Sequence, residues 1–134
     1  MKRIGAAVIG LGQSGMMLDA DKNRKELWTH CFSLDKHKDI DLIGVVDHDP
    51  TKELSIQSLL PQNKDISFFS HTEDMMSAIS PNFISICTPT ETHLQVIKKV
   101  LELDKLRFIF CEKPMGTSVK EAKEIIRLCR EKEI

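Results

Sequence analysis

The sequence predicts a doubly wound α/β fold, a parallel β-sheet with helices on both faces. Short apolar segments rich in β-branched and aromatic residues alternate with segments of helical spacing, which is typical of strands joined by crossover helices. The first apolar segment ends in closely spaced glycines, Gly10, Gly12 and Gly15, which suit a tight turn from a strand into a helix. At 134 residues the chain has the length of one domain, 1–134.

Five short segments have the composition of strands and are bounded by turn residues. They comprise residues 3–9, 41–46, 66–69, 83–87 and 108–111. The last is an unbroken apolar run, Phe-Ile-Phe-Cys, so we expect this strand to be covered on both faces of the sheet.

Two segments between the strands show clear helical spacing. Residues 118–131 carry apolar side chains at helical intervals, and Ser118 is the expected N-cap with Glu121 as its capping-box partner. Residues 92–103 place one apolar stripe opposite charged residues. That stripe consists of Leu94, Ile97, Val100 and Leu101.

Composition narrows the class of protein. With 41% apolar and 29% charged residues and a formal net charge of -1, the sequence is typical of a soluble globular domain. Lysines and arginines are spread along the chain, which gives no support for a nucleic-acid or membrane partner. The four cysteines form no CxxC pair and no metal-ligand spacing. We therefore expect no metal site and reduced thiols in a cytoplasmic protein.

The glycine turn suits a dinucleotide in a Rossmann-type fold. Gly10 would allow the tight turn, Gly12 the approach of a pyrophosphate, and Gly15 close packing of helix on strand. The helix N-terminus beyond it attracts phosphate, so we expect Gln13 and Ser14 to contact the cofactor as well. The alternative is a glycine-rich turn without a ligand.

Asp47 ends the second expected strand, where such folds hold the adenosine ribose. The usual distance from the last glycine is about 20 residues, and Asp47 lies well beyond it. The first crossover therefore carries extra residues, for which we propose the charged segment 18–28. A carboxylate here disfavours a 2'-phosphate, so NAD is expected rather than NADP. The alternative is a turn residue or helix cap.

The fourth strand ends in Cys-Thr-Pro-Thr-Glu-Thr-His, at the edge where open α/β sheets bind ligands. Thr88 and Thr90 offer hydroxyl groups there, and Pro89 stiffens the turn. Two alternatives stay open at the start of the next helix. Thr90 caps that helix or contacts the cofactor, and His93 packs within the cap region or contacts the cofactor.

Together these motifs resemble the glucose-fructose oxidoreductase / inositol dehydrogenase / rhizopine-catabolism (Gfo/Idh/MocA) family over nearly the whole chain. The matching stretches are VIGLGQSG, VVDHDP, CTPTETH and CEKPMGTSVKEA. The resemblance implies that Lys113 lies beside the nicotinamide and polarises the substrate hydroxyl. Glu112 would position this site, and Pro114 would aim the lysine. The alternative is an ion pair of Glu112 with Lys113 at the strand end, before a helix-starting proline.

The resemblance also implies an activity. It implies an NAD(P)-dependent oxidoreductase of the CH-OH class that transfers hydride between nicotinamide and a sugar, sugar derivative or cyclitol. Family members continue into a second domain that binds this substrate, so we expect the present chain to be the cofactor half and inactive alone. The alternative is a non-catalytic NAD-binding sensor, although the retained Lys113 favours the enzyme.

Two further expectations concern neighbouring chains and neighbouring strands. The uncovered sheet edge is expected to recruit another copy of the chain, which gives a homo-oligomer. Cys87 and Cys111 are expected at adjacent strand ends, yet as free thiols whose side chains lie on opposite faces.

Overall fold

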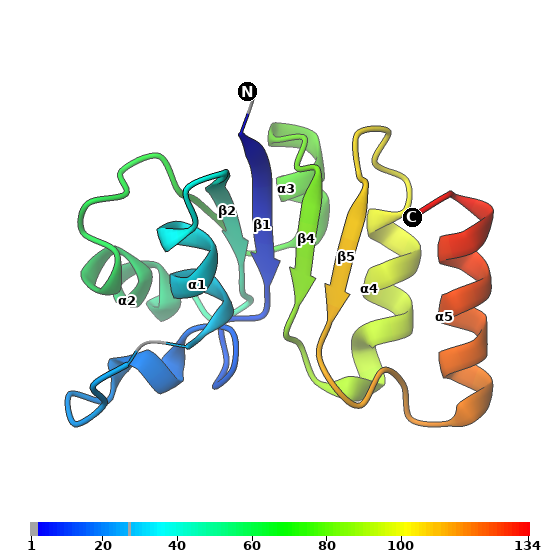
Figure 1. Ribbon diagram of the computed structural model, residues 1–134, viewed down its shortest axis with the longest axis horizontal. Helices are drawn as coiled ribbons and strands as arrows, with labels where there is room; N and C mark the ends of the chain where they lie inside the picture. Colours follow the sequence, from blue (N-terminus) through cyan, green and yellow to red (C-terminus); the bar gives the residue numbers. More distant parts are fainter. Residues whose placement is uncertain (1–2, 27) are drawn as a thin grey trace.

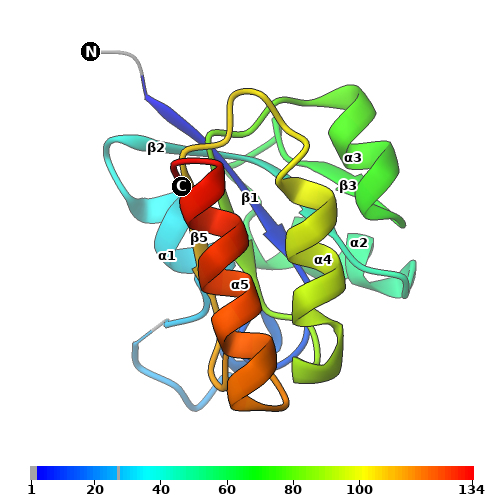
Figure 2. The ribbon, with the colours of Figure 1, turned by 90° about the vertical axis from the view of Figure 1, so that its right-hand side faces the viewer.

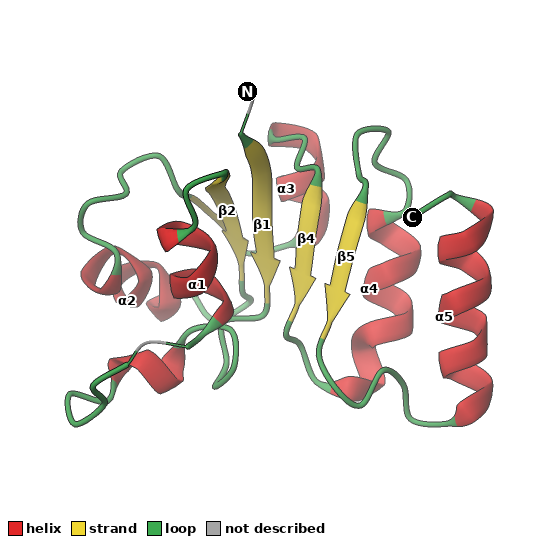
Figure 3. Ribbon diagram, viewed as in Figure 1, coloured by secondary structure: helices red, strands yellow, loops and turns green. Residues whose placement is uncertain are grey.

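All five strands of the sheet run parallel, in the order β3-β2-β1-β4-β5 (Figure 1). The computed structural model describes residues 3–26 and 28–134. The strands are β1 (Ile4–Ile9), β2 (Ile40–Val46), β3 (Ser67–Phe69), β4 (Phe83–Ile86) and β5 (Phe108–Cys111). Figure 3 shows the carboxyl ends of β1, β2, β4 and β5 pointing toward the loops of one edge of the sheet. The predicted fold class is therefore confirmed.

Helices cover both faces of the sheet (Figure 2). The helices are α1 (His30–Lys36), α2 (Thr51–Leu59), α3 (Thr72–Ala78), α4 (His93–Val100) and α5 (Val119–Glu131). Two short 3-10 helices, η1 (Met17–Ala20) and η2 (Thr90–Thr92), lie at the carboxyl edge. Within the described part of the chain, no helix has the length and apolar character needed to cross a membrane.

The core has two apolar layers, one on each face of the sheet. In β1, Ala7 and Ile9 contact the layer under α3, α4 and α5, whereas Ala6 and Val8 contact the layer under α1 and α2. This alternation follows from the period of two in a strand. All four of these side chains are buried, so burial on both faces holds β1 at the centre of the sheet.

The strand β5 departs from the expected burial. Ile109 and Cys111 pack against the layer under α4 and α5. On the other face Phe108 and Phe110 are 55% and 51% exposed. The expectation of two covered faces was wrong, because α1 and α2 lie over the β1 and β2 side of the sheet and leave this face of the edge strand open (Figure 1).

At the N-terminus of α5, Ser118 is the N-cap as expected, but the Glu121 carboxylate bonds to a different residue than a capping box would use. The backbone N–H of Glu121 donates to the Ser118 hydroxyl oxygen over 3.2 Å. The Glu121 carboxylate accepts from the backbone N–H of Thr117 over 2.7 Å, where a capping box would use Ser118. The Glu121 carboxylate thus accepts from the backbone of the residue before the N-cap.

The extra residues of the first crossover interrupt a helix rather than lengthen it. The backbone N–H of Met16 donates to Gly12, which forms a first helical turn after β1. The helix resumes at α1, where the N–H groups of His30 and Cys31 donate to the carbonyl oxygens of Ser14 and Gly15 over 3.1 and 3.0 Å. Between these two points the described residues include η1 and belong to no α-helix.

Asp19 links the two ends of the segment that lies between the first helical turn and α1. Its buried carboxylate accepts from the backbone N–H groups of Trp28 and Thr29 over 3.0 and 2.8 Å. The same carboxylate also accepts from the Thr29 hydroxyl over 2.5 Å, so it holds the two residues directly before α1 through charge-assisted hydrogen bonds. Asp19 therefore fixes where α1 begins.

Replacing Asp19 by alanine is expected to lower the free energy of unfolding by about 2 kcal/mol, because the charge-assisted hydrogen bonds of a buried carboxylate are lost. Urea unfolding followed by circular dichroism measures this change. Asp21→Ala is the matched control, since exposed Asp21 accepts from the backbone of Asn23 only two residues away. The control is expected to stay within ~0.5 kcal/mol of the wild type. Equal losses in both variants would contradict this role of Asp19.

The cysteines follow the expectation. Cys31, Cys87, Cys111 and Cys129 are all free thiols. Cys87 packs with the layer under α1 and α2, and Cys111 with the layer under α4 and α5, so they lie on opposite faces of adjacent strands.

Candidate functional site

A cleft of about 740 Å³ opens at the carboxyl edge of the sheet. The glycine turn, the ends of β2 and β3 and the loop after β4 line it. Of the residues predicted from sequence, the cleft contains Gly10, Gly12, Gln13, Asp47, Thr88 and Pro89. The others, Ser14, Gly15, Thr90, His93, Glu112 and Lys113, are not part of its lining.

Sequence reasoning missed the side of the cleft formed after β3. There Ser70, His71, Thr72 and Glu73 line the cleft, as do Lys52 of α2 and Lys99 of α4. Glu73 and Lys99 form an ion pair. The usable signal was their position directly after a parallel strand, since the carboxyl ends of all such strands share one edge.

The three glycines have different physical roles in the turn. Gly10 has a φ of 93°, and a Cβ there would lie 2.7 Å from the backbone of Cys87 and Thr88. A Cβ on Gly15 would lie 2.1 Å from the carbonyl oxygen of Gly10. At Gly12 a Cβ would meet nothing within 4 Å. Gly10 and Gly15 are thus required by the fold, whereas Gly12 leaves open space over the turn.

Asp47 connects the end of β2 to that turn. One carboxylate oxygen accepts from the backbone N–H of Leu11 over 2.8 Å, and the other accepts from Asp49 over 2.9 Å. The second contact is the turn role foreseen as an alternative. Each oxygen has a further lone pair, and Asp47 lines the cleft, so the carboxylate can also accept from a ligand.

The loop after β4 is held by hydroxyl groups. The Thr92 hydroxyl oxygen lies 2.7 Å from both the Pro89 carbonyl oxygen and the Thr88 hydroxyl. Thr92, not Thr90, occupies the N-cap position of α4, and it makes no side-chain capping bond. The expectation that Thr90 caps this helix was therefore wrong, because η2 intervenes and moves the start of α4 along the chain.

His93 is buried and joins two loops of the edge. Its Nε2 lies 2.8 Å from the carbonyl oxygen of Thr88, and its Nδ1 lies 3.3 Å from Sγ of Cys111 and 3.2 Å from the carbonyl oxygen of Met115. Both ring nitrogens face protein atoms. This is the packing role among the two alternatives, and it fixes the β4 loop relative to the loop after β5.

Glu112 and Lys113 follow β5 directly. One Glu112 oxygen lies 2.7 Å from Nε2 of His30, and the other accepts from the backbone N–H of Lys113 over 3.1 Å. The hydrogen bond from His30 is the main cause of the lowered pKa of Glu112. Lys113 is exposed, and its peptide bond to Pro114 is cis.

The alternative interpretation of this motif was wrong. Among the described residues, the side chain that contacts the Glu112 carboxylate is the His30 imidazole, and no ion pair with the Lys113 ammonium is formed. Pro114 does not start a helix either, because α5 begins at Val119. The Glu112 carboxylate is bound by the His30 imidazole, so the Lys113 ammonium is available to a ligand at the carboxyl edge of the sheet.

Two cysteine thiols lie at this edge of the sheet. Burial raises the pKa of Cys87 to about 11 and that of Cys111 to about 11, and the nearby Glu112 carboxylate also acts in that direction. Both thiols are therefore protonated near neutral pH, and a protonated thiol is a poor nucleophile.

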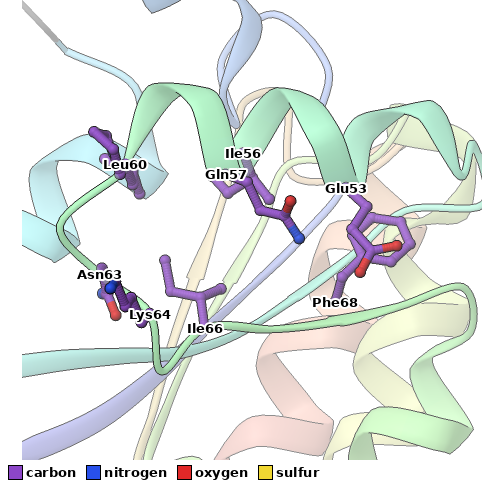
Figure 4. Close-up of a pocket in the computed structure, with 9 residues that line it drawn as sticks. Glu53, Ile56, Gln57, Leu60, Asn63, Lys64, Ile66 and Phe68 are labelled. Atoms are coloured by element: carbon purple, nitrogen blue, oxygen red, sulfur yellow. The ribbon is translucent and has the colours of Figure 1, made fainter.

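A second cavity of about 260 Å³ lies away from this edge, between α2 and the segment leading into β3 (Figure 4). Apolar side chains such as Ile56 and Phe68 line it together with Gln57 and Lys64. It contains none of the residues predicted from sequence.

The chain matches a known protein family. A family model described as "Oxidoreductase family, NAD-binding Rossmann fold" (GFO_IDH_MocA) matches residues 4–134. The chain belongs to this family. The resemblance inferred from the four motifs is confirmed, and the chain is an NAD-binding Rossmann domain.

Among curated proteins, the chain is 25% identical over 124 residues to D-glucoside 3-dehydrogenase of Escherichia coli (strain K12). The match covers 92% of this chain and 31% of that protein. The chain thus spans about a third of the length of this relative.

Two solved structures show the same fold. The WlbA dehydrogenase from Bordetella pertussis, in complex with NADH and UDP-GlcNAcA, is 19% identical with a TM-score of 0.76 over 98% of this chain and 33% of that one. The myo-inositol 2-dehydrogenase from Lactobacillus plantarum is 21% identical with a TM-score of 0.71 over 97% of this chain and 34% of that one.

Proposed function

We propose that this chain is the cofactor-binding part of a dehydrogenase that oxidises a hydroxyl-bearing carbon of a sugar, sugar derivative or cyclitol. The observation that carries the proposal is the exposed Lys113 at the end of β5, on the same sheet edge as the glycine turn. The names of the relatives, a glucoside dehydrogenase and an inositol dehydrogenase, support this substrate class. Association of copies through the uncovered β5 face stays part of the proposal.

The described residues fit NAD. The open space over Gly12 suits the pyrophosphate, and the remaining lone pairs of Asp47 suit the hydroxyl groups of the adenosine ribose. Thr88 and Pro89, in the loop after β4, line the same cleft as the glycine turn. When bound, NAD supplies the two-electron acceptor of the oxidation.

Lys113 supplies the polar part of the chemistry. Its ammonium, at Nζ, donates a hydrogen bond to the substrate hydroxyl oxygen and stabilises the negative charge that develops there. Glu112 holds the Lys113 backbone through one oxygen while its other oxygen is bound by His30. The Lys113 side chain thus extends from a strand end whose backbone is held in place.

Calorimetric titration tests the cofactor assignment. NAD is expected to bind more tightly than NADP, because the Asp47 carboxylate repels a 2'-phosphate. Asp47→Asn keeps an acceptor for Leu11 and removes the charge, so it is expected to narrow the preference by roughly tenfold or more. Asp49→Asn is the matched control and should keep the preference. Tighter binding of NADP by the unaltered chain would contradict the role of Asp47.

A further inference from the structure

A chain of side-chain hydrogen bonds links the interior of the sheet to the Glu-Lys-Pro loop. Nδ1 of His30 lies 2.7 Å from the Ser85 hydroxyl oxygen, and Nε2 of His30 lies 2.7 Å from Glu112. Ser85 is fully buried in β4. The imidazole packs edge-on against Phe110, with ring centroids 5.0 Å apart. No motif used above contains His30 or Ser85.

The chemistry of the groups gives these bonds a direction. A carboxylate only accepts hydrogen bonds, and the pKa of Glu112 is lowered chiefly by the bond from His30. Nε2 of His30 therefore carries the proton and donates to Glu112. In a ring whose single proton is on Nε2, Nδ1 accepts from the Ser85 hydroxyl. The Ser85 hydroxyl oxygen also lies 3.7 Å from Sγ of Cys87, which lines the cleft.

The backbone of His30 ties the same imidazole to the glycine turn. His30 is the first residue of α1, and its N–H donates to the carbonyl oxygen of Ser14 over 3.1 Å. The hydrogen bond from the Thr29 N–H to Asp19 holds the chain directly before His30 and so helps to place His30 here. One residue thus contacts the turn that holds the cofactor and the loop that carries Lys113.

We infer that His30 is a positioning residue for Lys113, with Ser85 orienting its ring. By holding one oxygen of Glu112, the imidazole keeps that carboxylate on the Lys113 backbone and away from the Lys113 ammonium. The ammonium then stays free to meet the substrate oxygen. The catalytic consequence rests on the proposed function, whereas the hydrogen-bond chain is a property of the present protein.

Two amide variants separate the two ends of the imidazole. His30→Gln extends a side-chain N–H group toward Glu112 and so keeps that bond. His30→Asn is shorter, reaches toward Ser85 and leaves Glu112 without its donor. A purely structural role in packing would affect both variants alike, whereas a positioning role requires the glutamine variant to retain what the asparagine variant loses.

The measurement is a 13C NMR titration of the Glu112 carboxyl, with the Lys113 amide signal as a second reporter. Charged or titratable groups facing Glu112 are His30, Lys113 and the thiols of Cys87 and Cys111. His30→Asn is expected to raise the pKa of Glu112 toward its ordinary value, and His30→Gln to keep most of the lowering. Equal shifts in both variants, or none, would overturn the inference.

The unaltered chain offers a test that needs no variant. Long-range 1H–15N spectra report which ring nitrogen of His30 carries the proton. The inference requires the proton on Nε2 whenever the ring is neutral. A neutral ring protonated on Nδ1 would overturn it even if both variants failed to fold.

In an active dehydrogenase that contains this chain, His30→Asn is expected to lower kcat by roughly tenfold with little change in KM, because the loss is one of orientation. In the Glu112→Gln background the same change should have no further effect, since the partner is already altered. An additive loss would overturn the inference. If the Lys113 variants discussed below turn over normally while the NMR result holds, the proposed function fails and the hydrogen-bond chain stands.

Discussion

Replacing Lys113 by alanine is expected to lower the turnover of an active dehydrogenase containing this chain by ~10²–10³, which is typical for the loss of one preorganised donor to a developing oxyanion. The exposed ammonium makes no ion pair among the described residues, so its removal leaves the fold intact. Steady-state kinetics with a sugar or cyclitol substrate measure the loss. The affinity for NAD, measured by calorimetry, should change little, because the glycine turn and Asp47 line the cleft and Lys113 does not.

Lys113→Met is the control for side-chain bulk, since it keeps most of the volume and removes the charge. It should lose as much turnover as the alanine variant if the ammonium is what matters. Normal turnover in both variants would show that Lys113 is a structural residue. In that case an NAD-binding sensor of the same family would explain the retained cofactor site better than an enzyme does.

Much of the fold could be predicted because its signals are local. Each strand is a short apolar run between turn residues, and the glycine turn follows directly from the first of them. The extra residues of the first crossover could be placed because Asp47 lies too far from Gly15. The structure shows that they interrupt the helix near Met16 and return at Thr29.

The remaining features depend on contacts between distant residues. His30 and Glu112 form a hydrogen bond although they are 82 residues apart in the sequence, and no sequence pattern connects them. The exposure of Phe108 and Phe110 depends on which helices lie over β5, which an apolar run cannot reveal. The cleft side formed by Ser70 to Glu73 follows a strand of only three residues, whose weak pattern drew no attention to its end.

Replacing Gly15 by alanine is expected to disrupt both the fold near the turn and NAD binding. The added Cβ would lie 2.1 Å from the carbonyl oxygen of Gly10, and no side-chain movement relieves a contact with backbone. The first helical turn must therefore shift away from β1, at a cost of about 1–3 kcal/mol or more for such overpacking. Urea unfolding measures the lost stability, and calorimetry measures the lost affinity for NAD.

Gly12→Ala is the matched substitution on the same turn, and it separates binding from folding. A Cβ at Gly12 meets nothing within 4 Å, so the free energy of unfolding is expected to stay within about 0.5 kcal/mol of the wild type. The methyl group would instead occupy the space assigned to the pyrophosphate, and the affinity for NAD is expected to fall at least tenfold, about 1.4 kcal/mol. Unchanged affinity in this variant would mean that the pyrophosphate does not lie over the turn. A loss of stability equal to that of Gly15→Ala would mean that Gly12 is also a packing residue.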